Sequence, residues 1–217
     1  MKLYKFRPLG TYNDYRRAKR IITEGKFWCS RFWDLNDPME GVFTIIASKA
    51  KISKIFGIKR EYLICSFSSN KALKKLFLWG YYANGFKGVA IEIEVKDDML
   101  SKIEPPKIAE VKYDSKRRFS NRFVGDIDAE EIADIVLTRK LKCWNFEEEF
   151  RFLIKDSENE QEIGEITKVI FGNPYERLGN TPEILNHSEK LIEYKKYREE
   201  LKIVCQNKGI KTDDFFV

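Results

Sequence analysis

The sequence predicts a single α+β domain over residues 1–217, with a mixed or antiparallel sheet flanked by helices. Two patterns predict it: short runs of alternating apolar and polar residues, typical of half-buried strands, and longer runs with the period of amphipathic helices. The chain has neither an internal repeat nor a linker rich in glycine and serine, so one domain is the simplest arrangement. Its 217 residues are 43% hydrophobic and 14% aromatic, which is enough for a sizeable core.

Each element follows from its local pattern. The first helix has Thr11 or Asn13 as its N-cap and Gly25 as its C-terminal stop. A later strand alternates, with its apolar side chains inward and with Glu92 and Glu94 toward solvent. Strands are expected at residues 3–7, 26–30, 61–68, 88–95, 108–113, 144–154, 165–171 and 210–217. Helices are expected at residues 13–23, 42–58, 70–83, 129–141 and 182–207, the last a charged helix that packs on the domain.

The composition argues against several classes of mechanism. The cysteines form no C-x-x-C pair and His187 is the only histidine, so no metal is expected and histidine-based catalysis is close to excluded. The chain has no apolar leader and no run of about 18 uncharged apolar residues, which predicts a cytoplasmic protein without a membrane partner. The net charge of +6 is compatible with a nucleic-acid or nucleotide partner but does not require one.

The most informative stretch is WNFEEEFRFLI, residues 144–154. In a strand, Glu147, Glu149 and Arg151 share one face, and the opposite face is mostly apolar. Carboxylates two residues apart have Cβ atoms about 7 Å apart, so both reach one small ligand. The alternative is a solvated face of an antiparallel strand, on which Arg151 screens the two acids.

Two other predicted strands carry polar side chains on one face. Arg7 shares its face with Leu3 and Lys5, and Ser66 and Ser68 end the face of a later strand. Arginine clamps phosphate through paired hydrogen bonds. Serine hydroxyls fix a ribose or orient a carboxylate, and a carboxylate stabilises an oxocarbenium charge or removes a proton from an acceptor. The three strands together predict a site for a phosphorylated ligand that loses a leaving group.

This order of residues resembles the R-S-E pattern of ADP-ribosyltransferases of the cholera-toxin-like class. Phe67 stands where the Ser-x-Ser of that class usually has threonine. The resemblance implies an ADP-ribosyltransferase-like split sheet and NAD as the donor of ADP-ribose. The residues that match the pattern are Arg7, Ser66, Ser68, Glu147 and Glu149.

The resemblance also implies a role for each residue. Arg7 would bind the pyrophosphate or the nicotinamide ribose, and Ser66 would steady Glu149. Glu149 would stabilise the oxocarbenium-like state as nicotinamide leaves, while Glu147 would position the acceptor, a protein or a nucleic acid. Stacking on a base or ring would fall to aromatic side chains, namely Trp28, Trp79 and Tyr82.

A second resemblance covers nearly the whole chain. Six ordered motifs look like a family of uncharacterised bacterial and phage proteins, some of which carry an abortive-infection label. This resemblance implies anti-phage defence or a toxin-type activity. Members often have histidine at the position of Tyr81, and tyrosine can stack or donate a hydrogen bond but does not titrate near neutral pH. The motifs are LYKFRPL (3–9), EGKFWCSRFWDLNDPMEG (24–41), ICSFS (64–68), LWGYYANGFKGVAIEIE (78–94), WNFEEEFR (144–151) and ITKVIFG (166–172).

Two other functions stay open. The first is a non-catalytic module that binds a nucleotide or a phage component, in which Glu147, Glu149 and Arg151 form a structural charge network. The second is a magnesium nuclease that combines Asp37 and Glu40 with the Glu-x-Glu pair. A tight, self-bonded turn is the favoured interpretation of residues 36–41, because Asn-Asp-Pro is strong turn chemistry.

Overall fold

The computed structural model describes residues 1–37, 40–96, 106–115, 119–121, 127–155, 158–174 and 188–216. The chain is mixed α+β, with a mostly antiparallel sheet flanked by helices, which confirms the predicted α+β class. The ADP-ribosyltransferase-like split sheet stays a prediction. Its contacts divide it into two compact units, which are described separately, and the expectation of one domain stays a prediction. Unit 1 comprises Met1–Phe27, Phe67–Lys96 and Glu162–Val217, and unit 2 comprises Trp28–Ser66 and Asp97–Gln161.

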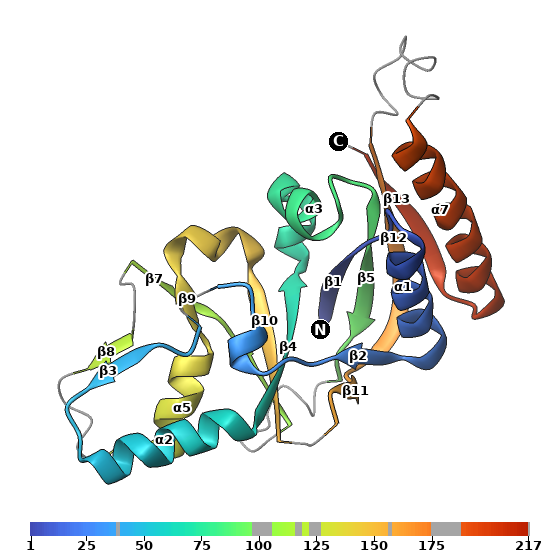
Figure 1. Cartoon of the computed structure of the whole chain (residues 1–217). Coiled ribbons are helices and arrows are strands. Elements are labelled where there is room, and N and C mark those ends of the chain that lie inside the picture. Colours follow the sequence, from blue (N-terminus) through green and yellow to red (C-terminus); the bar gives the residue numbers. More distant parts are fainter. Residues whose placement is uncertain are drawn as a thin grey trace. The chain divides into compact units, whose positions relative to one another are not determined.

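Unit 1 is built on antiparallel strands, with helices α1 and α7 side by side (Figure 1). Its sheet order is β13-β12-β5-β1, followed by the end of β4, and only β13 pairs in parallel. Helix α7 lies between β12 and β13 in the chain, as a crossover between parallel strands requires. The elements are β1 (Lys2–Pro8), α1 (Tyr12–Glu24), η2 (Asn70–Lys74), α3 (Leu76–Tyr82), β5 (Gly88–Glu94), β12 (Glu165–Asn173), α7 (Glu189–Asn207) and β13 (Lys211–Phe216).

The ends of helix α1 confirm the pattern-based prediction. The Thr11 side chain accepts a hydrogen bond from the Asp14 backbone N–H, and Gly25 closes the helix at φ 71°. A positive φ at this position is costly for residues with a Cβ atom, which is why glycine ends the helix. Tyr15 on α1 stacks on Tyr197 of α7, with ring centroids 5.3 Å apart.

Strand β5 differs from its predicted pattern, because Glu92 is buried. This strand lies between β1 and β12, and its side chains are buried from Gly88 to Ile93. The Glu92 carboxylate accepts hydrogen bonds from Lys2, Tyr4 and Thr167 at 2.7–2.8 Å. Burial alone would raise the pKa of Glu92, but these hydrogen bonds hold it below its ordinary value.

Unit 2 packs helices α2 and α5 around an apolar core, and its strands β4, β10 and β6 are neighbours in that order. The elements are η1 (Phe32–Asp34), β3 (Phe43–Ile45), α2 (Lys49–Glu61), β6 (Lys107–Glu110), β7 (Lys112–Asp114), β8 (Phe119–Asn121), α5 (Ala129–Leu137), β9 (Arg139–Leu141), η3 (Lys142–Glu147) and β10 (Glu149–Lys155). Three further strands have residues assigned to each unit: β2 (Lys26–Trp28), β4 (Tyr62–Ser69) and β11 (Glu160–Glu162).

Three predicted helices were wrong in extent. Residues 43–45 form β3 instead of helix, because an aromatic and β-branched run favours a strand, and α2 begins only after its N-cap Ser48. The helix expected at 70–83 is two short helices that meet at Lys75, and Ser69 caps the first. The helix expected at 129–141 ends at Leu137 and is followed by β9. Of the helix expected at 182–207, residues 182–187 lie outside the described part.

The strand expected at 144–154 begins only at Glu149. Residues 142–147 form the 3-10 helix η3, and Glu148 has a φ of 45°, so the chain turns before β10. Neither face of β10 is solvated, since its side chains from Arg151 to Ile154 are all buried. The alternative of an acidic face in water, screened by Arg151, was therefore wrong.

Candidate functional site

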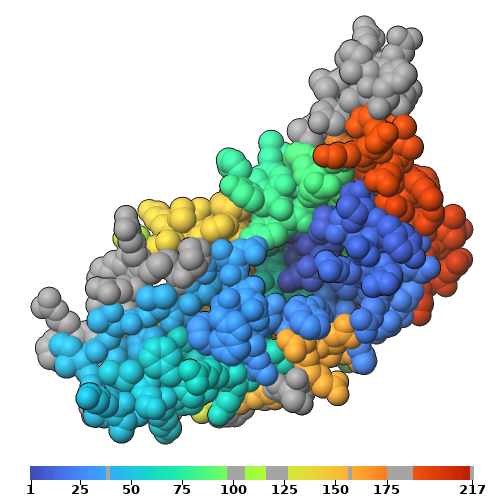
Figure 2. All heavy atoms as spheres, viewed as in Figure 1, coloured from blue at the N-terminus to red at the C-terminus, as the bar shows by residue number. Residues whose placement is uncertain are grey.

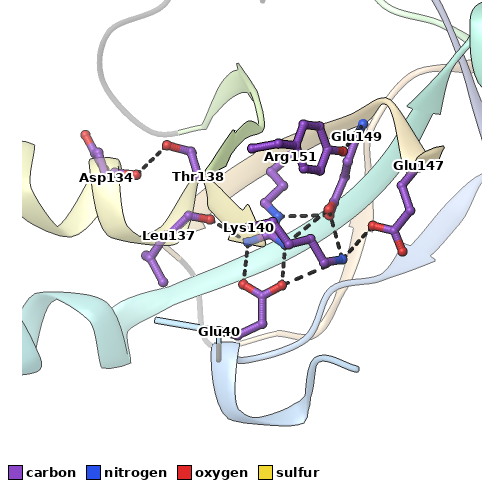
Figure 3. A network of polar contacts seen from close by, with 9 residues as sticks. Glu40, Asp134, Leu137, Thr138, Lys140, Glu147, Glu149 and Arg151 are labelled. Atoms are coloured by element: carbon purple, nitrogen blue, oxygen red, sulfur yellow. Dashed lines mark hydrogen bonds and ion pairs between the residues drawn. The ribbon is translucent and has the colours of Figure 1, made fainter. Parts of the chain in front are cut away.

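Unit 2 contains a cluster of five buried ionisable side chains, called the charge cluster below (Figure 3). Three elements and one turn supply it. Glu149 and Arg151 come from β10, Glu147 ends η3, Lys140 lies on β9, and Glu40 lies in the turn before β3. Three carboxylates and two cations give the cluster a net charge of −1 when every group is ionised.

Arg151 is the centre of the cluster and is 0% exposed. Its guanidinium donates to both oxygens of Glu40 and to both oxygens of Glu149, and these bonds include contacts of 2.8 Å to each carboxylate. A fifth bond, of 2.6 Å, reaches the carbonyl oxygen of Leu137 at the end of α5. These five bonds match the five N–H donors of a guanidinium. The neighbouring carboxylates outweigh burial and raise the pKa of Arg151.

Lys140 joins the three carboxylates. Its ammonium lies 2.6 Å from Glu147, 3.3 Å from Glu149 and 3.8 Å from Glu40. It also lies 4.9 Å from the centre of the Trp144 ring. Burial would lower the pKa of Lys140, but the charges of Glu149 and Glu147 raise it above its ordinary value. Lys140 therefore stays protonated and holds Glu147 beside Glu149.

The pKa values of the two carboxylates bound to Arg151 are shifted in opposite directions. Burial opposes ionisation of Glu149, yet the charges of Arg151 and Lys140 and hydrogen bonds from Arg151 and Ser66 lower its pKa. For Glu40, burial outweighs the attraction of Arg151 and Lys140 and raises its pKa. Arg151 and Lys140 thus hold Glu149 in its ionised form.

The charge cluster brings together some of the residues singled out from the sequence. Glu147, Glu149 and Arg151 belong to it, and the hydroxyl of Ser66, on β4, helps to lower the pKa of Glu149. Trp28 also belongs to unit 2 and is 54% exposed.

The remaining predicted residues lie in unit 1. Arg7 lies on β1 opposite Val89, and Ser68 lies on β4 opposite Tyr4. Trp79 is fully buried and stacks on Phe86 and Phe215, so its ring is a core residue rather than an open platform for a base. Tyr82 is half-buried and ends α3, and the neighbouring Tyr81 is exposed.

Sequence patterns missed two of the five residues of the charge cluster. Lys140 fell in a predicted helix, and nothing in its surroundings separates it from the other 39 lysines and arginines of the chain. Glu40 was noticed only as a weak metal ligand in a turn. Its burial beside an acidic turn residue, Asp37, is a signal that only the packing reveals.

A third buried cation lies against the turn that carries Glu40. Lys59 on α2 is 1% exposed and donates a hydrogen bond to the carbonyl oxygen of Gly41. Its ammonium lies 4.3–5.0 Å from the centres of three rings, which provide cation–π attraction. Burial lowers the pKa of Lys59 to about 8. The three rings are those of Phe32, Phe43 and Phe56.

The outer face of α2 borders a surface pocket of about 500 Å³, and this helix reaches the surface of unit 2 (cyan to teal in Figure 2). The lining residues follow one another at helical spacing, and they include two cations and one aromatic ring. This volume falls in the range of small-molecule sites. The lining residues are Lys49, Ile52, Ser53, Phe56, Gly57 and Arg60.

No family model, curated protein or solved structure matches this chain. The resemblances to ADP-ribosyltransferases and to the bacterial and phage family therefore stay predictions. Within the described ranges, no group of three or more histidine, cysteine, aspartate or glutamate residues is arranged to hold a metal ion. No helix in the described part of the chain is both long and apolar enough to cross a membrane.

Replacing Arg151 with methionine is expected to destabilise the protein by about 3–5 kcal/mol, because Glu40 and Glu149 would stay buried without their cation. Urea denaturation of R151M beside the parent measures this loss. The matched control is R20M, which removes an exposed ion pair to Glu24 and is expected to cost no more than about 0.5 kcal/mol. Equal losses in the two variants would contradict the central role of Arg151.

Lys59 is expected to make stability depend on pH in the alkaline range. Its pKa is about 8 in the folded protein and about 10.4 in an unfolded chain, so the unfolded state binds more protons between these values. The free energy of unfolding of the parent should therefore rise with pH across this window, relative to that of K59M. Urea denaturation at several pH values measures the difference, and parallel curves for the two proteins would refute it.

Proposed function

We propose that the charge cluster is the reaction centre of an ADP-ribosyltransferase-like enzyme that uses NAD. The observation that carries this proposal is the position of Ser66 beside Glu149, on the neighbouring strands β4 and β10. The serine and glutamate positions of the R-S-E pattern require such an arrangement.

The chemistry depends on a carboxylate that is ionised before the substrate arrives. Loss of nicotinamide from NAD leaves positive charge on the ribose, and a fixed anion stabilises that charge. Glu149 supplies the anion because its pKa lies below the ordinary value for glutamate. Lys140 contacts both Glu147 and Glu149 and so holds the two carboxylates near each other. Glu147 receives the proton of the acceptor as the new bond to ribose forms.

The net negative charge of the cluster favours the binding of a cationic group of the ligand. The five side chains carry a net charge of −1, and the nicotinamide ring of NAD is cationic. The Lys140 ammonium is closer to Glu147, at 2.6 Å, than to Glu149, at 3.3 Å. The cationic ring would replace Lys140 at Glu149 while Lys140 keeps Glu147. The resemblance assigns the phosphates of NAD to Arg7, and the chemistry requires no metal.

The proposed setting is the bacterial cytoplasm, in anti-phage defence or as a toxin-type activity. Both follow from the resemblance to the abortive-infection-like family. The acceptor is a protein or a nucleic acid, since either offers a nucleophile for the ribose.

Replacing Glu149 with glutamine tests the transfer reaction. Purified parent, E149Q and E110Q are incubated with NAD, with and without a protein extract or single-stranded and double-stranded DNA, and released nicotinamide is measured by chromatography. Release by E149Q is expected to fall by about 10²–10³-fold, because the anion at the developing charge is lost. E110Q, which changes an exposed glutamate on β6, should keep the activity of the parent.

Thermal unfolding of the same samples separates chemistry from folding. A folded E149Q that releases nicotinamide as fast as the parent would overturn the assignment of Glu149. Absence of nicotinamide release by the parent at high protein concentration, with every acceptor, would overturn the transferase itself.

The second candidate is a nucleotide-binding module without turnover. Two observations favour it: Arg151 and Glu149 are both buried with their polar atoms engaged, and the pocket beside α2 is open to ligand. In that pocket Lys49 and Arg60 match the phosphates of a nucleotide, and Phe56, 44% exposed, offers a ring face to its base. The charge cluster would then be structural.

Calorimetric titration with ATP and NAD tests this pocket. Replacing Arg60 with glutamine removes a charged donor worth about 1.5–3 kcal/mol, so affinity should fall by about 10–100-fold. The control is K54Q, because Lys54 is an exposed cation of the same helix that does not line the pocket. Equal affinities of R60Q and the parent would reject the pocket as the nucleotide site.

A further inference from the structure

Two buried thiols of unit 2 lie on adjacent antiparallel segments. Cys29 follows β2, Cys65 lies on β4, and both are thiols with no exposed surface. Neither proposed function uses them.

The backbone register places these two cysteines directly opposite each other. Ser30 and Ile64 form an antiparallel bridge and exchange both hydrogen bonds, at 2.9 and 2.8 Å. Cys29 precedes Ser30, and Cys65 follows Ile64 on the antiparallel segment. Cys29 and Cys65 are therefore the next pair in this register. Because the neighbouring pair is hydrogen-bonded, the cysteine pair is of the non-hydrogen-bonded kind, with Cα atoms about 4.5 Å apart and side chains on one face.

Two independent contacts agree with this register. The backbone N–H of Cys29 donates to the carbonyl oxygen of Asn159 at 2.7 Å, and its carbonyl oxygen accepts from the Asn159 side chain at 2.8 Å. The backbone polar groups of Cys29 are therefore engaged elsewhere, as a non-hydrogen-bonded position requires. The sulfur of Cys65 lies 3.7 Å from the carbonyl oxygen of Trp28, the residue immediately before Cys29.

We propose that Cys29 and Cys65 are a redox pair that closes into a cross-strand disulfide under oxidation. A Cα separation of about 4.5 Å lies at the lower limit of the range that disulfides span, so the backbone needs little movement. The disulfide would join β4 to the segment after β2, and on β4 its cysteine, Cys65, directly precedes Ser66. The other two cysteines differ in kind, since Cys143 is exposed and Cys205 is buried on α7.

A low-molecular-weight disulfide such as oxidised glutathione completes the reaction. The thiolate of one cysteine attacks that disulfide, forms a mixed disulfide and releases one glutathione thiolate. The second cysteine, as its thiolate, attacks the protein sulfur of the mixed disulfide and releases the second. Two cysteines lose two protons and two electrons, and one oxidised glutathione becomes two glutathione molecules. Because both thiols are buried, the first attack waits for local opening of the bridge, and reduced glutathione reverses the reaction.

The test uses the full chain in its folded state, with Cys143 replaced by serine so that the exposed thiol cannot react. After incubation with oxidised glutathione, the intact mass of C143S should fall by two hydrogens. Tryptic digestion without reductant should join the peptide Phe27–Arg31 to the peptide Glu61–Lys71. The melting temperature of the oxidised protein should rise, since the bond restricts the unfolded chain.

Two matched variants complete the experiment. C29S/C143S and C65S/C143S each keep one thiol of the pair and should show neither the mass loss nor the rise in melting temperature. The proposal is overturned if Cys29 and Cys65 stay reduced in folded C143S, or if each carries its own glutathione. It is also overturned if the linked peptides form only after denaturation, because the folded register would then not create the pair.

Discussion

The structure of unit 2 depends on how it neutralises one buried guanidinium. A fully buried cation is tolerated only when anions and hydrogen-bond acceptors surround it. Arg151 takes one carboxylate from its own strand, Glu149, and another from Glu40, which is 111 residues away in the sequence. The Leu137 carbonyl adds the negative end of helix α5. The paths of the Glu40 turn, of α5 and of β10 are therefore all constrained by a single side chain.

The same contacts account for both candidate functions. Cations that stabilise a buried carboxylate also keep it ionised, and an ionised carboxylate is what a developing positive charge needs. The functions differ in whether a ligand cation can replace Lys140, whose contact with Glu149 is longer than its contact with Glu147. Arg151 is not exchangeable in this way, since five hydrogen bonds hold it. Lys140 is accordingly the side chain whose mobility would distinguish a reaction centre from a structural network.

Local patterns predicted the elements whose signals are local, and they failed where distant segments decide burial. The capped helix α1 and the strands β5 and β12 follow from spacing, glycine and alternation. Alternation also grouped Glu147, Glu149 and Arg151, but it could not show that Glu40 and Lys140 cover them. Glu92 was misplaced for the same reason, because it lies on a central strand whose neighbours bring Lys2, Tyr4 and Thr167 to it. A period of two identifies which side chains share a face and leaves open what lies against that face.

Unit 2 buries Arg151 and Lys59 in different ways, and the difference explains the turn between them. Arg151 is matched by carboxylates, whereas Lys59 is held by three aromatic rings and the Gly41 carbonyl. Gly41 has a φ of +68°, and a Cβ atom there would come within 2.9 Å of the Lys59 ammonium. Only glycine meets both conditions without strain. Because Gly41 follows Glu40 directly, the contact that holds Lys59 also sets where the Glu40 carboxylate meets Arg151. The three rings around Lys59 and the charge cluster therefore depend on one turn.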